Sequence, residues 1–160
     1  MTSSIMQYDY DLLVIGAGSG GISTARRATE NGAKVAICEQ KALGGTCVNA
    51  GCIPKKLLVY AAEFADAFQD AKAYGWQHVS PEFHWQTLRD NVQSEVQRIN
   101  NTYQGLLKDA GINVLRGTAR LVDANQIEIN GTPVAARFIV IATGAKSLMP
   151  PIPGIEHAVN

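Results

Sequence analysis

A glycine-rich loop between an apolar strand and a helix constrains the fold of this chain most strongly. Residues 10–18 read YDLLVIGAG, a continuous apolar run that ends in glycines. Such a run is typical of a strand buried on both faces of a sheet. The composition becomes helical from Ser19 to Asn31, and Gly32 is suited to end that helix. Residues 33–39, AKVAICE, then predict a second buried strand, so the segment predicts a β-α-β unit.

The loop at residues 16–21 fits the pattern G-x-G-x-x-G. Alone this pattern is weak, because a tight β-α turn followed by a surface glutamate has the same appearance. Here it lies between a predicted strand and a predicted helix, and Glu39 ends the next strand at the required distance. The glycines allow a pyrophosphate to approach the backbone at a helix N-terminus. Glu39 would accept hydrogen bonds from ribose hydroxyls, so the pattern predicts a dinucleotide site without a 2′-phosphate.

The rest of the chain predicts two long helices followed by β structure. Pro54 suits the first turn of a helix that continues towards Gly75, and apolar residues at helical spacing predict a second helix from Trp85 to near Gly111. Strands are expected in residues 112–122, 126–129 and 136–143, with a turn at Asn130–Gly131. We therefore predict an α/β, Rossmann-like domain with a parallel sheet, two long helices and a β-hairpin or meander.

Composition excludes several classes of partner and location. The 160-residue chain has 14 Lys plus Arg and 14 Asp plus Glu, and no long block of like charge predicts a nucleic-acid surface. The N-terminal apolar run is too short for a signal peptide or a membrane span. Three cysteines are too few for a secreted disulfide framework. The sequence predicts a soluble, cytoplasmic protein that binds neither nucleic acid nor membrane.

Two of the cysteines lie in the segment GGTCVNAGCIPKK, residues 44–56. Cys52 comes directly before the predicted first turn at Pro54, where the positive end of the helix dipole lowers a thiol pKa. Lys55 adds positive charge nearby. The segment therefore predicts a redox-active pair made of Cys47 and Cys52.

Cysteines at this spacing are also compatible with a buried, inert pair or with a metal site. A buried pair would be favoured if the flanking glycines, proline and lysines were absent. A zinc site would need four ligands, and the segment contains neither a C-x-x-C pair nor a nearby histidine, so we predict no metal. Cys38, inside the second predicted strand, is expected to be a small core residue.

The cysteine segment resembles the redox-active disulfide signature of the flavoprotein pyridine nucleotide-disulfide oxidoreductases, and is most similar to their glutathione reductase branch. The motif is highly specific. Other matching stretches agree with it in order and spacing and cover nearly the whole chain: IGAGSGG, Glu39, YGW through FHW, RGTARLVDA and IVIATGA. Relatives that act on dihydrolipoamide or mercuric ion usually have PSK where this chain has Pro54-Lys55-Lys56.

The resemblance implies that FAD is the bound dinucleotide. Ser19 and Gly20 would meet its pyrophosphate, and Glu39 its adenosine ribose. Thr46 and Cys47 would lie along the flavin, with Lys55 near the N5 edge, while the Ala119 backbone would contact adenine. The complete set of implied cofactor residues is Gly16, Gly18, Ser19, Gly20, Gly21, Glu39, Thr46, Cys47, Lys55, Ala119, Thr143 and Gly144.

The resemblance also implies roles for the two catalytic cysteines and for a substrate site. Cys52 would face the flavin, and Cys47 would attack glutathione disulfide. Ser19, Arg26 and Tyr103 match positions that contact this substrate. Considered alone, Arg26 would be a solvated helix residue and Tyr103 a core aromatic. The alternatives are a non-catalytic FAD-binding fragment, or a relative that acts on dihydrolipoamide, thioredoxin, glutathione amide or trypanothione.

The family resemblance further predicts the domain organisation. Residues 1–150 would form the first segment of a discontinuous FAD-binding domain, and residues 151–160 a linker towards a nicotinamide-nucleotide domain that is absent. The complete enzyme would use NADPH and form a homodimer, whereas this chain alone is expected to be inactive. His78, His84 and His157 match no catalytic position, so no catalytic base is assigned.

Overall fold

The computed structural model describes residues 7–77 and 80–158, so His78 lies outside the described residues. A six-stranded sheet has the strand order β3-β2-β1-β6-β5-β4. Its strands are β1 (Tyr10–Ile15), β2 (Val35–Glu39), β3 (Asn113–Arg116), β4 (Ala119–Leu121), β5 (Gln126–Ile129) and β6 (Thr132–Ile141). The pairs β3-β2, β2-β1 and β1-β6 are parallel, and β6-β5 and β5-β4 are antiparallel. The predicted α/β class is confirmed.

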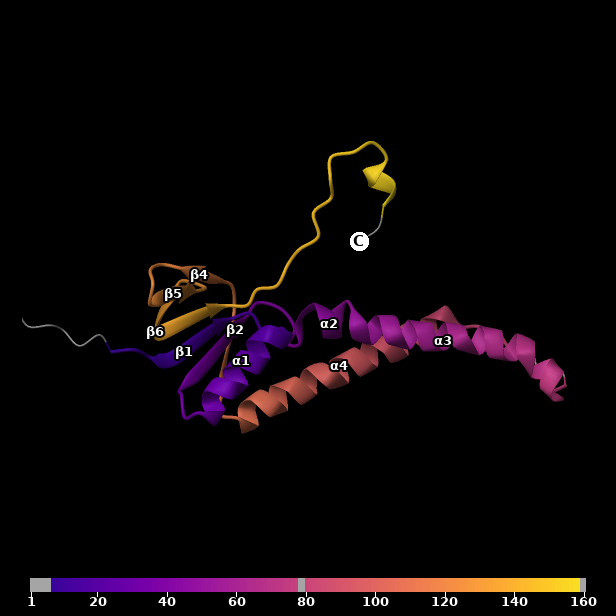
Figure 1. The fold of residues 1–160 in the computed structure, drawn as a ribbon, viewed down its shortest axis with the longest axis horizontal. Coiled ribbons are helices and arrows are strands. Elements are labelled where there is room, and N and C mark those ends of the chain that lie inside the picture. Colours follow the sequence, from indigo (N-terminus) through magenta and orange to yellow (C-terminus); the bar gives the residue numbers. More distant parts are fainter. Residues whose placement is uncertain (1–6, 78–79, 159–160) are drawn as a thin grey trace, which may run out of the picture.

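The β1-α1-β2 unit forms as the sequence predicts. Helix α1 (Ser19–Glu30) begins directly after the glycine loop and lies against β1 and β2 (Figure 1). Gly32 has a φ of +85°, and its N–H donates a 2.9 Å bond to the Thr29 carbonyl, which closes the helix. Ile22 and Ala25 of the helix are buried in one core cluster with residues of β1 and β2. This packing holds the loop at one end of the parallel strands.

The opposite face of β1 and β2 forms a second core cluster. Successive strand residues point to opposite faces, so Leu13, Ala36 and Cys38 lie on this side. They pack with Ile127 and with residues of β6. Cys38 is only 2% exposed, which confirms the prediction that it is a core residue.

Two long helices extend away from the sheet (Figure 1). Helix α3 (Cys52–Asp70) continues into a 3-10 turn, η1 (Ala71–Tyr74), which ends at Gly75 with a φ of +89°. Helix α4 (Trp85–Asp109) runs back to the sheet. No residue of α3 is fully buried, and Leu107 is the buried residue of α4. The predicted helices are confirmed, but much of their apolar surface is exposed.

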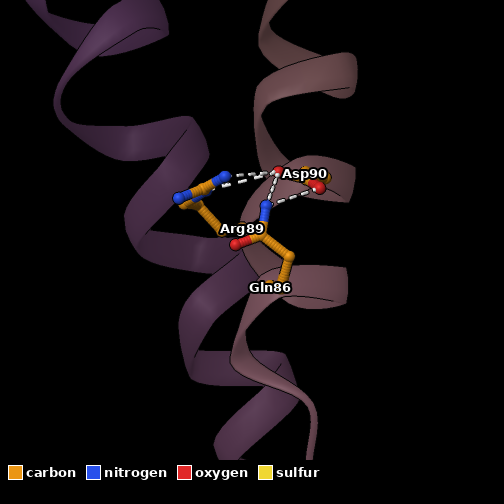
Figure 2. A network of polar contacts seen from close by, with 3 residues as sticks. All are labelled: Gln86, Arg89 and Asp90. Carbon is orange, nitrogen blue, oxygen red and sulfur yellow. Dashed lines mark hydrogen bonds and ion pairs between the residues drawn. The ribbon is translucent and has the colours of Figure 1, made fainter.

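A network of exposed polar side chains lies near the start of α4 (Figure 2). The Asp90 carboxylate accepts hydrogen bonds from Gln86 Nε2 at 2.9 Å and from Arg89 Nη2 at 3.1 Å. The Gln86 bond, followed by the Arg89 bond, lowers the pKa of Asp90. Because all three side chains are exposed, the network contributes little to the free energy of unfolding.

Several elements differ from those expected, and β6 begins at Thr132 and ends at Ile141 rather than covering residues 136–143. Residues 112–122 form two strands rather than one, because the chain bends at Gly117, whose φ is +146°. Strand β3 then joins β2 while β4 joins β5. A short helix, α2 (Gly45–Asn49), also precedes α3, and a 3-10 turn, η2 (Ile155–His157), follows the extended segment after β6.

Within the described ranges, no helix combines the length and apolar character needed to cross a membrane.

Candidate dinucleotide and dithiol site

The glycine loop packs so tightly that two of its glycines cannot carry a side chain. Gly16 has a φ of +104°, and a Cβ there would overlap the Ala142 carbonyl at the end of β6. A Cβ on Gly21 would overlap the carbonyl of Gly16. The loop therefore passes close to β6 before α1 begins at Ser19, and Gly20 is exposed with open space around its Cα. This exposed backbone at a helix N-terminus suits a pyrophosphate.

Glu39 ends β2 directly beside this loop. Its Oε2 accepts a 2.8 Å hydrogen bond from the Ala17 N–H, and its Oε1 accepts one of 2.8 Å from the Lys41 N–H. Backbone donors on both sides therefore fix the carboxylate. The structure places the predicted ribose acceptor at the loop, as the spacing of the motif required.

A cavity of about 110 Å³ opens next to Glu39. Four residues of the predicted cofactor set line it: Gly16, Glu39, Ala119 and Thr143. Gly144 follows Thr143 outside this cavity and is exposed. Glu39 and Ala119, which the resemblance assigns to the ribose and the adenine of FAD, therefore share one cavity, and their contacts with a nucleotide remain predictions.

The two cysteines lie on consecutive helices. Cys47 is in the middle of α2 and Cys52 is the first residue of α3, and both are exposed free thiols. A hydrogen bond with Cys52 is the main cause that raises the pKa of Cys47, followed by desolvation and by the charge of Cys52. Cys52 is thus near enough to influence the ionisation of Cys47, while the role of the two thiols as a redox pair remains a prediction.

The glycine loop and the cysteine segment touch through their backbones. The Gly44 N–H donates a 2.8 Å hydrogen bond to the Ala17 carbonyl. A Cβ on Gly45 would lie only 2.7 Å from the Cα of Gly18, and Gly45 has a φ of +63°. The dithiol segment thus begins against the loop that would bind a pyrophosphate.

Thr46 and Lys55 complete the predicted cofactor set around the cysteines. Thr46 is exposed in α2, and Lys55 is exposed in the first turn of α3, where its N–H donates a 3.0 Å bond to the Gly51 carbonyl. Both residues are therefore on the helices that carry the two sulfurs. Their contacts with a flavin remain predictions.

A second cavity brings the three predicted substrate residues together. Ser19, Arg26 and Tyr103 line about 300 Å³ between α1 and α4. Arg26 Nη2 lies 3.7 Å from Glu30 Oε1, and both side chains are about half exposed or more. Tyr103 also packs against the core. Four further lining residues were not predicted, namely Ile22, Ser23, Arg27 and Glu30. Helical spacing of three or four residues from Ser19 or Arg26 would have indicated Ile22, Ser23 and Glu30.

Sequence reasoning also missed two asparagines beside the cysteine segment. Asn49 ends α2, and its Nδ2 donates hydrogen bonds to the carbonyls of Leu43 at 3.0 Å and Gly45 at 2.9 Å. Asn100 of α4 donates from its own Nδ2 to the Leu43 carbonyl at 2.8 Å and to Asn49 Oδ1 at 3.0 Å. Asn49 lies inside the cysteine segment without an assigned role, and no sequence motif marked Asn100.

The remaining histidines lie away from these cavities. His84 is 3.7 Å from Glu82, and His157 is 3.5 Å from Glu156, with all four side chains exposed. In the part of the chain that the structure describes, no cluster of three or more His, Cys, Asp or Glu side chains is arranged to hold a metal ion.

Together the fold and the site define a Rossmann-like α/β domain with an adjoining pair of thiols. The family model described as pyridine nucleotide-disulphide oxidoreductase matches residues 10–160. The chain belongs to this family.

Several curated relatives are similar over nearly the whole chain. A protein named glutathione reductase from Burkholderia cepacia is 44% identical, covering 98% of this chain and 35% of the relative. A chloroplastic/mitochondrial glutathione reductase from Pisum sativum is 39% identical, covering 96% of this chain and 30% of the relative. Thioredoxin reductase SEP1 from Emiliania huxleyi is 39% identical, and the match covers 92% of this chain and 33% of the relative. The chain spans about a third of the length of the curated relatives it matches.

Proposed function

We propose that this chain supplies the FAD site and the redox dithiol of an enzyme that reduces glutathione disulfide with NADPH. The observation that carries the proposal is the backbone contact between the two motifs. The Gly44–Ala17 hydrogen bond and the close approach of Gly45 to Gly18 join the cysteine segment to the dinucleotide loop. A cofactor bound at the loop would therefore lie next to the dithiol. The similarity to relatives named glutathione reductase supports the same assignment.

The thiol chemistry follows from the two adjacent sulfurs. Bound FAD would supply a carrier that passes two electrons to the Cys47–Cys52 disulfide. Once reduced, Cys47 attacks one sulfur of glutathione disulfide, the substrate S–S bond breaks, and the first glutathione leaves as a thiolate that takes up a proton. Cys52 then attacks the Cys47 sulfur and releases the second glutathione. Two electrons pass from the dithiol to the substrate, and the Cys47–Cys52 bond forms.

Protonation of Cys47 controls the first of these steps. The attacking species is the thiolate, and the hydrogen bond with Cys52 raises the pKa of Cys47. The reaction of Cys47 should therefore become faster as pH increases towards that pKa. At neutral pH the attack by Cys47 needs a basic group that removes the proton from the Cys47 thiol.

The cavity between α1 and α4 suits a small, anionic disulfide. Glutathione disulfide carries carboxylates, and Arg26 and Arg27 bring two guanidinium groups to this cavity. A carboxylate that displaces Glu30 from Arg26 would form a charge-assisted pair. Tyr103 offers a ring and a hydroxyl on the opposite helix.

The larger organisation belongs to the same proposal. Residues 1–150 would form the first segment of the FAD-binding domain and residues 151–160 a linker to a nicotinamide-nucleotide domain. The active assembly would be a cytoplasmic homodimer. The relatives, which are about three times longer, support an enzyme with more than this one domain.

The proposal is tested by trapping the mixed disulfide on Cys47. In a Cys52→Ser chain, the rate of glutathionylation at Cys47 is compared with its reaction with uncharged hydroxyethyl disulfide. Arg26→Glu should lower the glutathione disulfide rate about tenfold, because a charge-assisted hydrogen bond contributes about 1.5–3 kcal/mol. The hydroxyethyl disulfide rate should stay constant. Arg120→Gln, on β4, is the control. Equal effects on both disulfides, or none, would contradict the proposed substrate site.

A protein disulfide is the second candidate substrate. The relative named thioredoxin reductase and the exposure of both cysteines favour it. The same Cys52→Ser chain distinguishes the candidates when oxidised thioredoxin is offered beside glutathione disulfide. Trapping of thioredoxin that is insensitive to Arg26→Glu would favour the protein substrate.

A further inference from the structure

An asparagine clamp joins α4 to the segment that carries Cys47. We use this name for the side chains of Asn49 and Asn100 with the carbonyl of Leu43. The Leu43 carbonyl accepts hydrogen bonds from both asparagines, at 3.0 Å and 2.8 Å, and Asn100 also donates to Asn49 Oδ1 at 3.0 Å. Asn49 Nδ2 also donates a 2.9 Å hydrogen bond to the Gly45 carbonyl at the start of α2. Both ends of this five-residue helix are therefore tied to the clamp.

The clamp matters because α2 has little intrinsic stability. A single turn of helix fixes several backbone dihedrals for very few internal hydrogen bonds, and its sequence begins with glycine. Val48 is its buried residue, whereas Cys47 is exposed. The position of Cys47 therefore depends on the side-chain bonds that hold the two ends of α2.

Asn100 also lies one turn from the proposed substrate cavity. It is three residues before Tyr103 on α4, so the two side chains share a face of the helix. Asn100 contacts the cysteine segment, while Tyr103 lines the cavity that contains Arg26. One rigid helix thus carries both the holder of Cys47 and part of the cavity wall.

We propose that Asn100 is a positioning residue that fixes Cys47 relative to Cys52 and to the Arg26–Tyr103 cavity. The inference about the cavity rests on the proposed function, whereas the inference about the sulfur pair does not. The hydrogen bonds of Asn100 go to the Leu43 carbonyl and to Asn49, not to either sulfur, so Asn100 acts on Cys47 through these two residues. Loss of its two hydrogen bonds should lower the fraction of molecules in which the Cys47 and Cys52 sulfurs are adjacent.

The chain offers well-matched variants for this test. Asn100→Ala removes both hydrogen bonds that Asn100 donates: the Leu43 carbonyl keeps its bond from Asn49, whereas Asn49 Oδ1 loses its bond from Asn100. Asn100→Asp keeps the shape but places acceptor oxygens against the two oxygens that Asn100 now serves. Asn101→Ala is the control, because Asn101 is the next residue of α4, is exposed, and accepts one exposed bond from Gln97. Both alanine changes alter helix propensity equally.

The decisive measurement is the equilibrium between the Cys47–Cys52 dithiol and dithiothreitol in the full chain, which involves no glutathione. Asn100→Ala and Asn100→Asp should each make the Cys47–Cys52 disulfide about five- to tenfold less stable, tenfold being about 30 mV. Asn101→Ala should leave the equilibrium constant unchanged. An unchanged constant in folded Asn100 variants overturns the inference. Unfolding of Asn100→Ala under conditions where Asn101→Ala is folded assigns Asn100 a structural role and overturns it as well.

A second readout separates this inference from the proposed function. In the Cys52→Ser chain, the Asn100 variants should lower the rate ratio of glutathione disulfide to hydroxyethyl disulfide about fivefold, and Asn101→Ala should not. If Arg26→Glu leaves this ratio unchanged, the proposed substrate site is wrong, and the dithiothreitol equilibrium alone decides the role of Asn100. If Arg26→Glu lowers the ratio and the Asn100 variants do not, the positioning role towards the cavity is wrong.

Discussion

The Ala17 N–H donates a 2.8 Å hydrogen bond to the Glu39 carboxylate, which joins the glycine loop after β1 to the end of β2. The other carboxylate oxygen accepts the Lys41 N–H at 2.8 Å. The loop and its acid are therefore arranged before any nucleotide binds. A nucleotide that binds to both the loop and the carboxylate therefore loses little free energy to the ordering of the site.

Replacing the carboxylate should weaken FAD binding. Glu39→Gln removes the negative charge and replaces one acceptor oxygen with an NH₂ group. This group would lie opposite a backbone N–H and could not accept its hydrogen bond. We expect the FAD dissociation constant to rise about tenfold or more, because hydrogen bonds to a charged group contribute about 1.5–3 kcal/mol. Titration of the chain with FAD, followed by flavin fluorescence, measures the effect. Glu63→Gln, at an exposed position of α3, is the control, and equal FAD affinity in both variants would show that Glu39 does not bind the nucleotide.

The backbone contact between Gly45 and Gly18 should make Gly45 sensitive to a single methyl group. Gly45→Ala places a Cβ 2.7 Å from the Gly18 Cα at a φ of +63°. The left-handed conformation alone costs about 1–2 kcal/mol for a residue with a Cβ. Urea unfolding should therefore show a destabilisation of at least this size.

Gly105 provides the matched control for that substitution. It lies within α4, and a Cβ there would meet no atom within 4 Å. Gly105→Ala should stabilise the chain by about 0.5–1 kcal/mol, because glycine is unfavourable inside a helix. A stability of Gly45→Ala equal to that of the unmodified chain would contradict the close packing of the loop and the cysteine segment.

The hydrogen bond with Cys52 should shift the pH dependence of Cys47 reactivity. This bond raises the pKa of Cys47, so the folded chain disfavours its thiolate. The stabilisation from the bond is present below the pKa of the unfolded thiol and is lost as pH rises through the raised pKa. In Cys52→Ala the pKa of Cys47 should fall, and alkylation at Cys47 should reach its half-maximal rate at a lower pH. Peptide-resolved mass spectrometry after iodoacetamide treatment measures this profile, and a shift to higher pH would be the opposite of the expected result.

The sequence predicts the regular elements because their periodicities reflect the buried faces. The apolar run of β1, the helix that ends at Gly32 and the acid at Glu39 all occur where they were expected. Ser19, Arg26 and Tyr103 also share one cavity, whereas the substrate contacts that the family resemblance implies for them stay a prediction. Motifs of this kind specify backbone geometry locally, so they can be recognised without knowledge of the packing.

Features that depend on tertiary contacts could not be predicted in this way. Helix α2 contains five residues that begin with glycine, and its ends are held by Asn49 and by Asn100 from a distant helix. The break between β3 and β4 lies at Gly117, where the Asn130 side chain occupies the space that a Cβ would need. The apolar spacing of α3 predicts an amphipathic helix, but it does not specify which surface covers Phe64, which is 63% exposed.

In the proposed reaction, Cys47 and Cys52 together reduce glutathione disulfide. The most direct measurement mixes the fully reduced chain with glutathione disulfide and determines both the glutathione released and the sulfur bonds formed. We expect two glutathione molecules released per chain and a Cys47–Cys52 disulfide in the peptide map, with Cys38 remaining a free thiol because it is buried. A persistent mixed disulfide with one glutathione released, or a disulfide that contains Cys38, would contradict the proposed reaction.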